Sequence, residues 1–198
     1  MDDPQTARPN GLILAGGQGR RMGGKNKGWI PWHGKPLILH ALERLLPQVH
    51  TLAISSNSEI DHYRRLGFPV LGDRHPDFRG PLAGVAEGLR WSRGRNLLCL
   101  PVDAPQAPLD LAARLEHALL ASDAEVALAH DGQRLQPLFA LLRTSVTEDL
   151  LGDLENGPLA AGSWFCSRRH CVVDFSDQPD AFVNLNHPGD LEPTPTDP

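Results

Sequence analysis

The chain contains 198 residues, of which 40% are hydrophobic and 22% are charged, and its formal net charge is −5. A chain of this length can bury the core of one domain, and its acidic balance argues against a protein that coats nucleic acid. No apolar run approaches the roughly 20 residues of a membrane span, and the N-terminus lacks the apolar segment of a signal peptide. The three cysteines form no Cys-x-x-Cys pair, which is typical of reduced thiols. We therefore expect a cytoplasmic protein that binds neither nucleic acid nor membranes.

Apolar runs alternate with helical patterns along the chain. In chain order we expect a strand over 11–15, a helix over 36–46, a strand over 51–54, a helix over 59–66, a strand over 69–71, a helix over 82–91, a strand over 96–102, a helix over 109–120, strands over 125–129 and 138–142, a helix over 145–154, and short strands over 171–175 and 182–185. This alternation predicts an α/β fold with a mostly parallel sheet between helices on both faces. We expect one domain over residues 11–191, with flexible tails at 1–10 and 192–198.

One expected strand contains a proline, and several end in polar residues. Pro101 has no N–H to donate, so we expect strand pairing to fail locally there. In parallel sheets of this kind the ligand binds outside the carboxyl ends of the strands. The residues at those ends that could do chemistry are Gly16, Gly17, Asn57, Asp73 and Asp103. The sequence therefore predicts a binding site along one edge of the sheet.

The basic residues are distributed unevenly. Sixteen are arginine and only three are lysine, and those three, Lys25, Lys27 and Lys35, fall within eleven residues. An ammonium is a compact point charge on a flexible stem, whereas a guanidinium is a wide planar fork. Lysine retained in this one window suggests chemistry that arginine cannot perform.

Most of that window belongs to a glycine-rich loop. Residues 14–28 contain six glycines and four cations directly after the first expected strand. Glycine allows close approach of the backbone to a phosphate, and the cations neutralise it. A P-loop is excluded because Asn26 stands where Ser or Thr should bind magnesium, and a dinucleotide fingerprint is excluded because Met22 replaces its third glycine.

The loop resembles that of another class of phosphate-handling enzymes. Leu14-Ala-Gly-Gly-x-x-x-Arg-Met-Gly23, followed by Lys27-Gly28, is similar to the signature of the nucleotidyltransferase superfamily. Three further segments are similar to the molybdenum cofactor guanylyltransferase family, namely 34–37, 80–84 and 182–188. The resemblance covers residues 11 to 191. It implies a three-layer α/β/α Rossmann-like fold and transfer of GMP from GTP to the terminal phosphate of molybdopterin, with Mg²⁺ as cofactor and pyrophosphate released.

The resemblance also implies roles for particular residues. Lys27 would contact the triphosphate, Arg21 would hold the leaving pyrophosphate with its bidentate fork, and Asp103 would bind the metal. Lys35 would steady the loop from the start of the next helix. Arg20 and Lys25 would add positive charge.

The remaining predicted contacts fall on the nucleotide and on the acceptor. Guanine would lie against Leu14, Ala15 and Gly16, and Gly17 and Asp73 would also contact the nucleotide. Residues 55–58 depart from the usual pattern, so either Ser55 or Asn57 could make the neighbouring contact. A second departure is Asn26, where relatives often carry Asp. The acceptor side would contain Gly80, Gly84, Asn184 and Asn186, the two asparagines sharing one face of a short strand.

Two alternatives remain open from the sequence. The first is another nucleotidyltransferase, such as a molybdopterin cytidylyltransferase or a sugar-phosphate enzyme. The glycine-rich loop barely distinguishes these enzymes from a guanylyltransferase. The second is a non-catalytic nucleotide-binding regulatory module on the same fold. Expected partners are GTP, molybdopterin and other molybdenum-cofactor biosynthesis proteins, and the chain is expected to be a monomer or a weak homo-oligomer.

Overall fold

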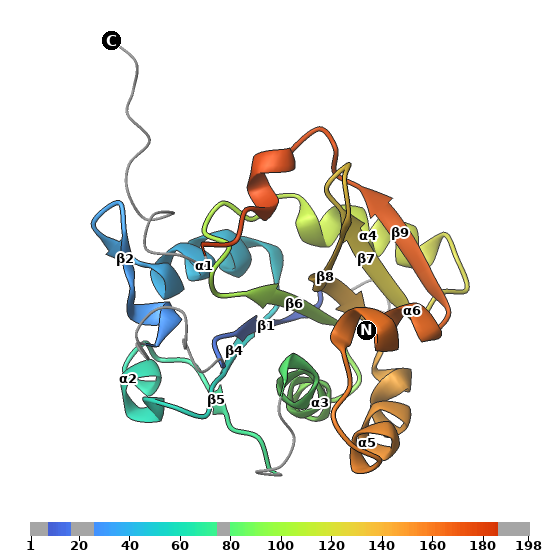
Figure 1. Ribbon diagram of the computed structural model, residues 1–198, viewed down its shortest axis with the longest axis horizontal. Helices are drawn as coiled ribbons and strands as arrows, with labels where there is room; N and C mark the ends of the chain where they lie inside the picture. Colours follow the sequence, from blue (N-terminus) through green and yellow to red (C-terminus); the bar gives the residue numbers. More distant parts are fainter. Residues whose placement is uncertain (1–7, 17–25, 75–79, 186–198) are drawn as a thin grey trace.

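A seven-stranded sheet forms the centre of the molecule (Figure 1). The computed structural model describes residues 8–16, 26–74 and 80–185. The strands of the sheet, in spatial order, are β5 (Val70–Leu71), β4 (Leu52–Ser55), β1 (Asn10–Leu14), β6 (Leu97–Pro101), β8 (Leu135–Leu142), β7 (Val126–His130) and β9 (His170–Asp174). Only β8 runs antiparallel to its neighbours within this sheet, which confirms the prediction of a mostly parallel sheet.

Helices cover both faces of the sheet, as predicted. The helices are α1 (Leu37–Leu45), α2 (Ile60–Arg64), α3 (Pro81–Ser92), α4 (Leu111–Leu120), α5 (Thr147–Glu155) and α6 (Ala161–Ser167). Residues of α1 and α4 enter one core cluster, and residues of α3, α5 and α6 enter the other. Figure 1 shows α1 and α4 above the sheet and α3 and α5 below it. The fold therefore has the three layers expected of an α/β/α protein.

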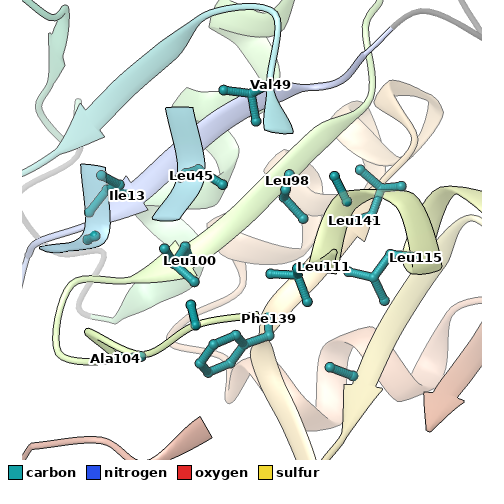
Figure 2. Packing of buried hydrophobic residues seen from close by; sticks show 14 of the residues in the cluster. Ile13, Leu45, Val49, Leu98, Leu100, Ala104, Leu111, Leu115, Phe139 and Leu141 are labelled. Carbon is teal, nitrogen blue, oxygen red and sulfur yellow. The ribbon is translucent and has the colours of Figure 1, made fainter. Parts of the chain in front are cut away.

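The central strand β1 explains why its sequence is a continuous apolar run. Ile13 packs into the cluster under α1 and α4, whereas Leu12 and Leu14 pack on the other face. A strand buried on both faces needs apolar residues at every position rather than at alternate ones. Figure 2 shows Ile13 beside Leu45 of α1 and Leu100 of β6.

Pro101 interrupts the sheet on one side only. The pairing of β6 with β8 extends from Leu97 to Cys99, whereas its pairing with β1 continues to Pro101, opposite Leu14. The predicted local failure of pairing is therefore confirmed on the β8 side, where a proline has no N–H to donate. The chain leaves the sheet immediately afterwards and reaches Asp103.

The structure differs from the sequence prediction at several boundaries. Asn10, assigned to the N-terminal tail, is buried and is the first residue of β1. The helix expected from Pro36 begins at Leu37, because a hairpin of β2 (Pro31–Trp32) and β3 (Lys35–Pro36) precedes it. His33 and Gly34 both have positive φ values, 48° and 75°, as a two-residue hairpin turn requires. Histidine is not a strong signal for this turn, and neither the hairpin nor α6 was predicted.

The strand expected over residues 182–185 is wrong. Pro179–Phe182 form a 3₁₀ helix, and residues 183–185 have no regular structure. Phe182 is buried beside Phe139 and Phe175, and Leu185 packs separately against Ile30 and Leu37. Two independent anchors, with the exposed Val183 between them, therefore account for the apolar residues of this segment without a strand.

Gly84 allows α3 to lie close to the sheet, and its replacement by alanine should destabilise the protein by about 1–3 kcal/mol. A Cβ at this position would lie 2.2 Å from Ser55 Oγ and 3.3 Å from Leu14 Cδ2. The double variant Gly84→Ala/Ser55→Ala should recover part of the loss because the hydroxyl is removed. Urea denaturation measures both effects.

Gly152 provides the matched control within α5. A Cβ there meets nothing within 4 Å, so Gly152→Ala should be neutral or stabilising by up to about 1 kcal/mol. If Gly84→Ala were as stable as Gly152→Ala, the close approach of α3 to β4 would not constrain the sequence.

Candidate active site

The predicted site residues meet at one edge of the sheet because four adjacent strands are parallel. In the order β5-β4-β1-β6, these strands end at Leu71, Ser55, Leu14 and Pro101. Asp73, Asn57, Ala15 and Asp103 follow these ends within two residues. The chain passes from β1 to β4 and β5 on one side and returns to β6 on the other side, which creates a topological switch point at β1. Ligands of open α/β sheets bind at such points.

Lys27 and Asp103 form an ion pair at this edge. Lys27 Nζ lies 2.7 Å from Asp103 Oδ2, and the two side chains are 22% and 15% exposed. Lys27 begins a 3₁₀ helix, η2 (Lys27–Trp29), and Asp103 lies in the turn after β6. The structure therefore places the predicted phosphate-binding cation against the predicted metal ligand, in a partly solvated position that a ligand can reach.

Asn57 and Asp73 form a second hydrogen-bonded pair. Asn57 Nδ2 donates to Asp73 Oδ2 at 2.6 Å, and the Asp73 N–H donates to Asn57 Oδ1 at 2.8 Å. Burial raises the pKa of the Asp73 carboxyl, and the hydrogen bond from Asn57 opposes that increase. Ser55 is only 5% exposed and lies against α3. Of the two alternatives left by the sequence, the structure therefore favours Asn57 over Ser55 as a contact for a ligand.

The end of β1 offers fewer backbone groups than the sequence suggests. The carbonyl of Leu14 accepts from the N–H of Val102 at 3.1 Å, and the N–H of Ala15 donates to the carbonyl of Ser55 at 2.9 Å. The side chains of Leu14 and Ala15 are buried, whereas Gly16 is exposed. The carbonyl of Leu14 is therefore already engaged within the sheet.

A late segment of the chain reaches the same site. The N–H of Leu185 donates to the main-chain carbonyl of Asp103 at 2.9 Å. This contact brings Asn184, the residue before Leu185, near Asp103, although the two are far apart in the sequence. Asn184 lies on an irregular segment and not on the predicted strand. Gly80 immediately precedes α3 with φ 134°, a conformation that side chains rarely adopt. Gly84 faces β4, so the structure gives it a packing role rather than the predicted place on the acceptor side.

Comparison with known proteins places this arrangement in a family. A family model described as the MobA-like NTP transferase domain matches residues 11–170. The chain belongs to this family. It is 45% identical over 177 residues to a molybdenum cofactor guanylyltransferase of Shewanella sp. (strain MR-4), covering 89% of this chain and 90% of that protein. It is 41% identical over 183 residues to one of Shewanella halifaxensis (strain HAW-EB4), covering 92% of each.

Solved structures support the same fold. The crystal structure of molybdopterin-guanine dinucleotide biosynthesis protein A from Archaeoglobus fulgidus aligns with a TM-score of 0.77 at 20% identity, covering 92% of this chain and 94% of that one. A nucleotidyl transferase from Methanothermobacter thermautotroptrophicus aligns with a TM-score of 0.66 at 18% identity, covering 91% and 93%. The MobA-like chain thus shares the fold of these structures, and its family shows it to be a nucleotidyltransferase.

Some predicted residues of this MobA-like transferase lie outside the described part of the chain. They are Gly17, Arg20, Arg21, Lys25 and Asn186. Lys35 is described, and its ammonium pairs with Glu43 of α1 rather than with Asp103. Both groups of this pair are largely solvated, at 33% and 63% exposure. The sequence predicts that Lys35 lies at the start of the next helix and steadies the loop, whereas the structure places it in β3, where its ammonium ties the hairpin to α1.

The described side chains fit Mg²⁺ only if a bound ligand supplies further oxygen atoms. Within residues 8–16, 26–74 and 80–185, no three His, Cys, Asp or Glu side chains gather as a metal cluster. Mg²⁺ is commonly bound by one or two carboxylates together with substrate phosphates, and Asp103 provides a carboxylate where phosphates are expected.

Within the described residues, no helix has the length and apolarity to cross a membrane.

One group of residues beside Lys27 was not predicted from the sequence. Asn26, Ser58 and Tyr63, here called the Asn26 cluster, are joined by hydrogen bonds between their side chains. The available signals were weak: Asn26 interrupts a run of basic residues, and Tyr63 is the only tyrosine of the chain. Neither signal indicates a partner more than 30 residues away.

Proposed function

We propose that the chain transfers GMP from GTP to the terminal phosphate of molybdopterin, forming the guanine dinucleotide cofactor and releasing pyrophosphate. The observation that carries this proposal is the pairing of Lys27 with Asp103 at the switch point of the sheet. Its support from sequence is identity of 41–45%, over about nine-tenths of the chain, to proteins named molybdenum cofactor guanylyltransferase. We expect the reaction to occur in the cytoplasm, with other cofactor-biosynthesis proteins as partners.

The proposed reaction needs positioning and charge neutralisation more than covalent help from the protein. A phosphate oxygen of molybdopterin attacks the α-phosphorus of GTP, in line with the departing pyrophosphate. Lys27 neutralises phosphate charge from its place on η2, and Arg21 is proposed to hold the pyrophosphate. Mg²⁺, when bound, supplies further neutralisation of the phosphate oxygens, and Asp103 would hold it.

Selection of guanine requires acceptors, because N1–H and the 2-amino group of guanine are donors. The carbonyls of Ala15 and Gly16 follow β1, and the carboxylate of Asp73 lies beside Asn57 two strands away in the sheet. A cytosine edge offers an acceptor where guanine offers a donor, and therefore leaves such groups unpaired. Gly80 and Asn184 are proposed to contact molybdopterin.

A comparison of nucleotides tests the proposed function. Pyrophosphate release with molybdopterin and Mg²⁺ should be faster with GTP than with CTP by a kcat/KM factor on the order of 10² or more. Omission of molybdopterin should abolish release, and a sugar 1-phosphate should not replace it. Faster turnover of CTP would favour the cytidylyltransferase alternative, and turnover with the sugar phosphate alone would favour the sugar-phosphate alternative.

A further inference from the structure

The side chain of Asn26 connects three segments of the chain. Its Oδ1 accepts from the N–H of Gly28 at 3.1 Å and from the hydroxyl of Tyr63 at 2.6 Å. Its Nδ2 donates to Ser58 Oγ at 3.1 Å. Asn26 therefore caps the 3₁₀ helix that begins with Lys27, and it ties that helix to the segment after β4 and to α2.

Tyr63 is a rigid and constant partner for Asn26. Its side chain is fully buried, and burial raises the pKa of its hydroxyl, so that the group remains a donor. The residue after Lys27 is fitted to this ring, because a Cβ on Gly28 would lie 2.2 Å from Tyr63 Oη. The next residue, Trp29, has its ring centroid 5.0 Å from that of Tyr63 and 4.8 Å from that of His62. The backbone on both sides of Lys27 is thus held by α2.

A fixed backbone matters for a lysine in this place. The lysine stem is flexible, and a misplacement of about 1 Å in a catalytic group can reduce a rate by about 10²-fold. The Asn26 cluster also reaches Ser58, which is next to Asn57 and hence to the Asn57–Asp73 pair. The cluster joins the Lys27–Asp103 side of the site to the Asn57–Asp73 side.

We propose that Asn26 is a positioning residue for nucleotidyl transfer: with Tyr63 and Ser58, it holds Lys27 against Asp103. This inference rests on the proposed function for the reaction that it serves. The connection itself is a property of the folded chain and can be tested without turnover.

Kinetics give the first test. Asn26→Ala should lower kcat by about 10–100-fold, with a much smaller change in the KM for GTP. Asn26→Asp keeps an acceptor for Gly28 and Tyr63, and the Ser58 hydroxyl can rotate to donate, so it should restore most of the rate. Tyr63→Phe, which removes only the hydroxyl, should lower kcat in the same direction and guards against a failure of Asn26→Ala to fold.

A double-variant cycle separates positioning from general damage. If Asn26 acts through Lys27, then Asn26→Ala should cause little further loss in a chain that already carries Lys27→Ala. A merely structural role would lower the melting temperature and leave kcat unchanged well below it. Losses that multiply in the double variant, or a normal kcat in Asn26→Ala, would overturn the proposal.

Acetylation of the lysines gives a test that does not depend on turnover. Mass spectrometry can follow the labelling rate of Lys27 against that of Lys35, which pairs with Glu43 elsewhere on the chain. Labelling of Lys27 should rise severalfold in Asn26→Ala and Tyr63→Phe, and should stay low in Asn26→Asp. Unchanged labelling of Lys27 in all three variants would overturn the positioning role. If the labelling of Lys27 changes as expected but the protein does not turn over GTP, the result would support the positioning role and refute the proposed function.

Discussion

Asp103→Ala should reduce nucleotidyl transfer on the order of 10³-fold while leaving the fold intact. The change removes the carboxylate proposed to hold Mg²⁺ and leaves Lys27 without the partner that lies 2.7 Å away. Preorganised charges of this kind at a phosphoryl-transfer site are each worth about 10²–10³ in rate. The contact with Leu185 uses the main-chain carbonyl of Asp103, which alanine also supplies. The measurement is kcat from pyrophosphate release at saturating GTP and Mg²⁺, together with the melting temperature.

Two further variants sharpen this prediction. Asp103→Asn retains the shape of the side chain but not its charge, and it should lose nearly as much activity as the alanine variant. Asp149→Asn removes an exposed carboxylate of α5 that pairs with Arg168, in the layer of helices that packs on the other core cluster, and it should behave as wild type. Substantial turnover by Asp103→Ala in the presence of Mg²⁺ would show that Asp103 is not the metal ligand.

Lys27→Arg should lose about 10²-fold in kcat although the charge is conserved. Lys27 is partly buried, and it lies in the chain between Asn26, which caps η2, and Gly28, which cannot be enlarged without a clash with Tyr63. A guanidinium is wider and planar, and it cannot place a point charge at the same distance from Asp103 and a phosphate. Lys27→Ala should lose at least as much. Single-turnover measurements with GTP distinguish the chemical step from binding.

Lys35→Arg is the matched control for lysine geometry. Its ion pair with Glu43 is largely solvated, and exposed pairs of this kind contribute little. Transfer by Lys35→Arg should therefore remain close to that of the wild type. Normal turnover by Lys27→Arg would mean that the clustering of lysines has no chemical cause.

The strand ends of the site were predictable because they depend on local patterns. Apolar runs located β1, β4, β5 and β6, and the parallel arrangement then brought Asp103 and Asp73 to one edge. This convergence needs only the order of elements and the polarity of the residues after each strand. The roles expected of Lys27 and Asp103 came from the family resemblance, and their ion pair was not predicted.

The features that were missed depend on contacts between distant residues. Ser55 and Asn57 differ in exposure because Gly84 of α3 approaches one of them, and no periodicity encodes that approach. The Asn26 cluster joins residues 32 and 37 positions apart. The apparent strand at 182–185 arose because two unrelated packing sites bury Phe182 and Leu185. Single-sequence patterns describe neighbours along the chain and cannot distinguish such cases.

The contact between Leu185 and Asp103 affects when the site can form during protein synthesis. Domains generally fold from the N-terminal end as the chain is made, and β1, β4 and β6 pair with one another using residues no later than Pro101. The turn that bears Asp103 obtains its hydrogen bond from Leu185 only after residue 185 has been translated. A nascent chain can therefore assemble half of the sheet before the loop that carries its key carboxylate is fastened. Completion of the candidate site thus waits for synthesis of the segment that carries Leu185.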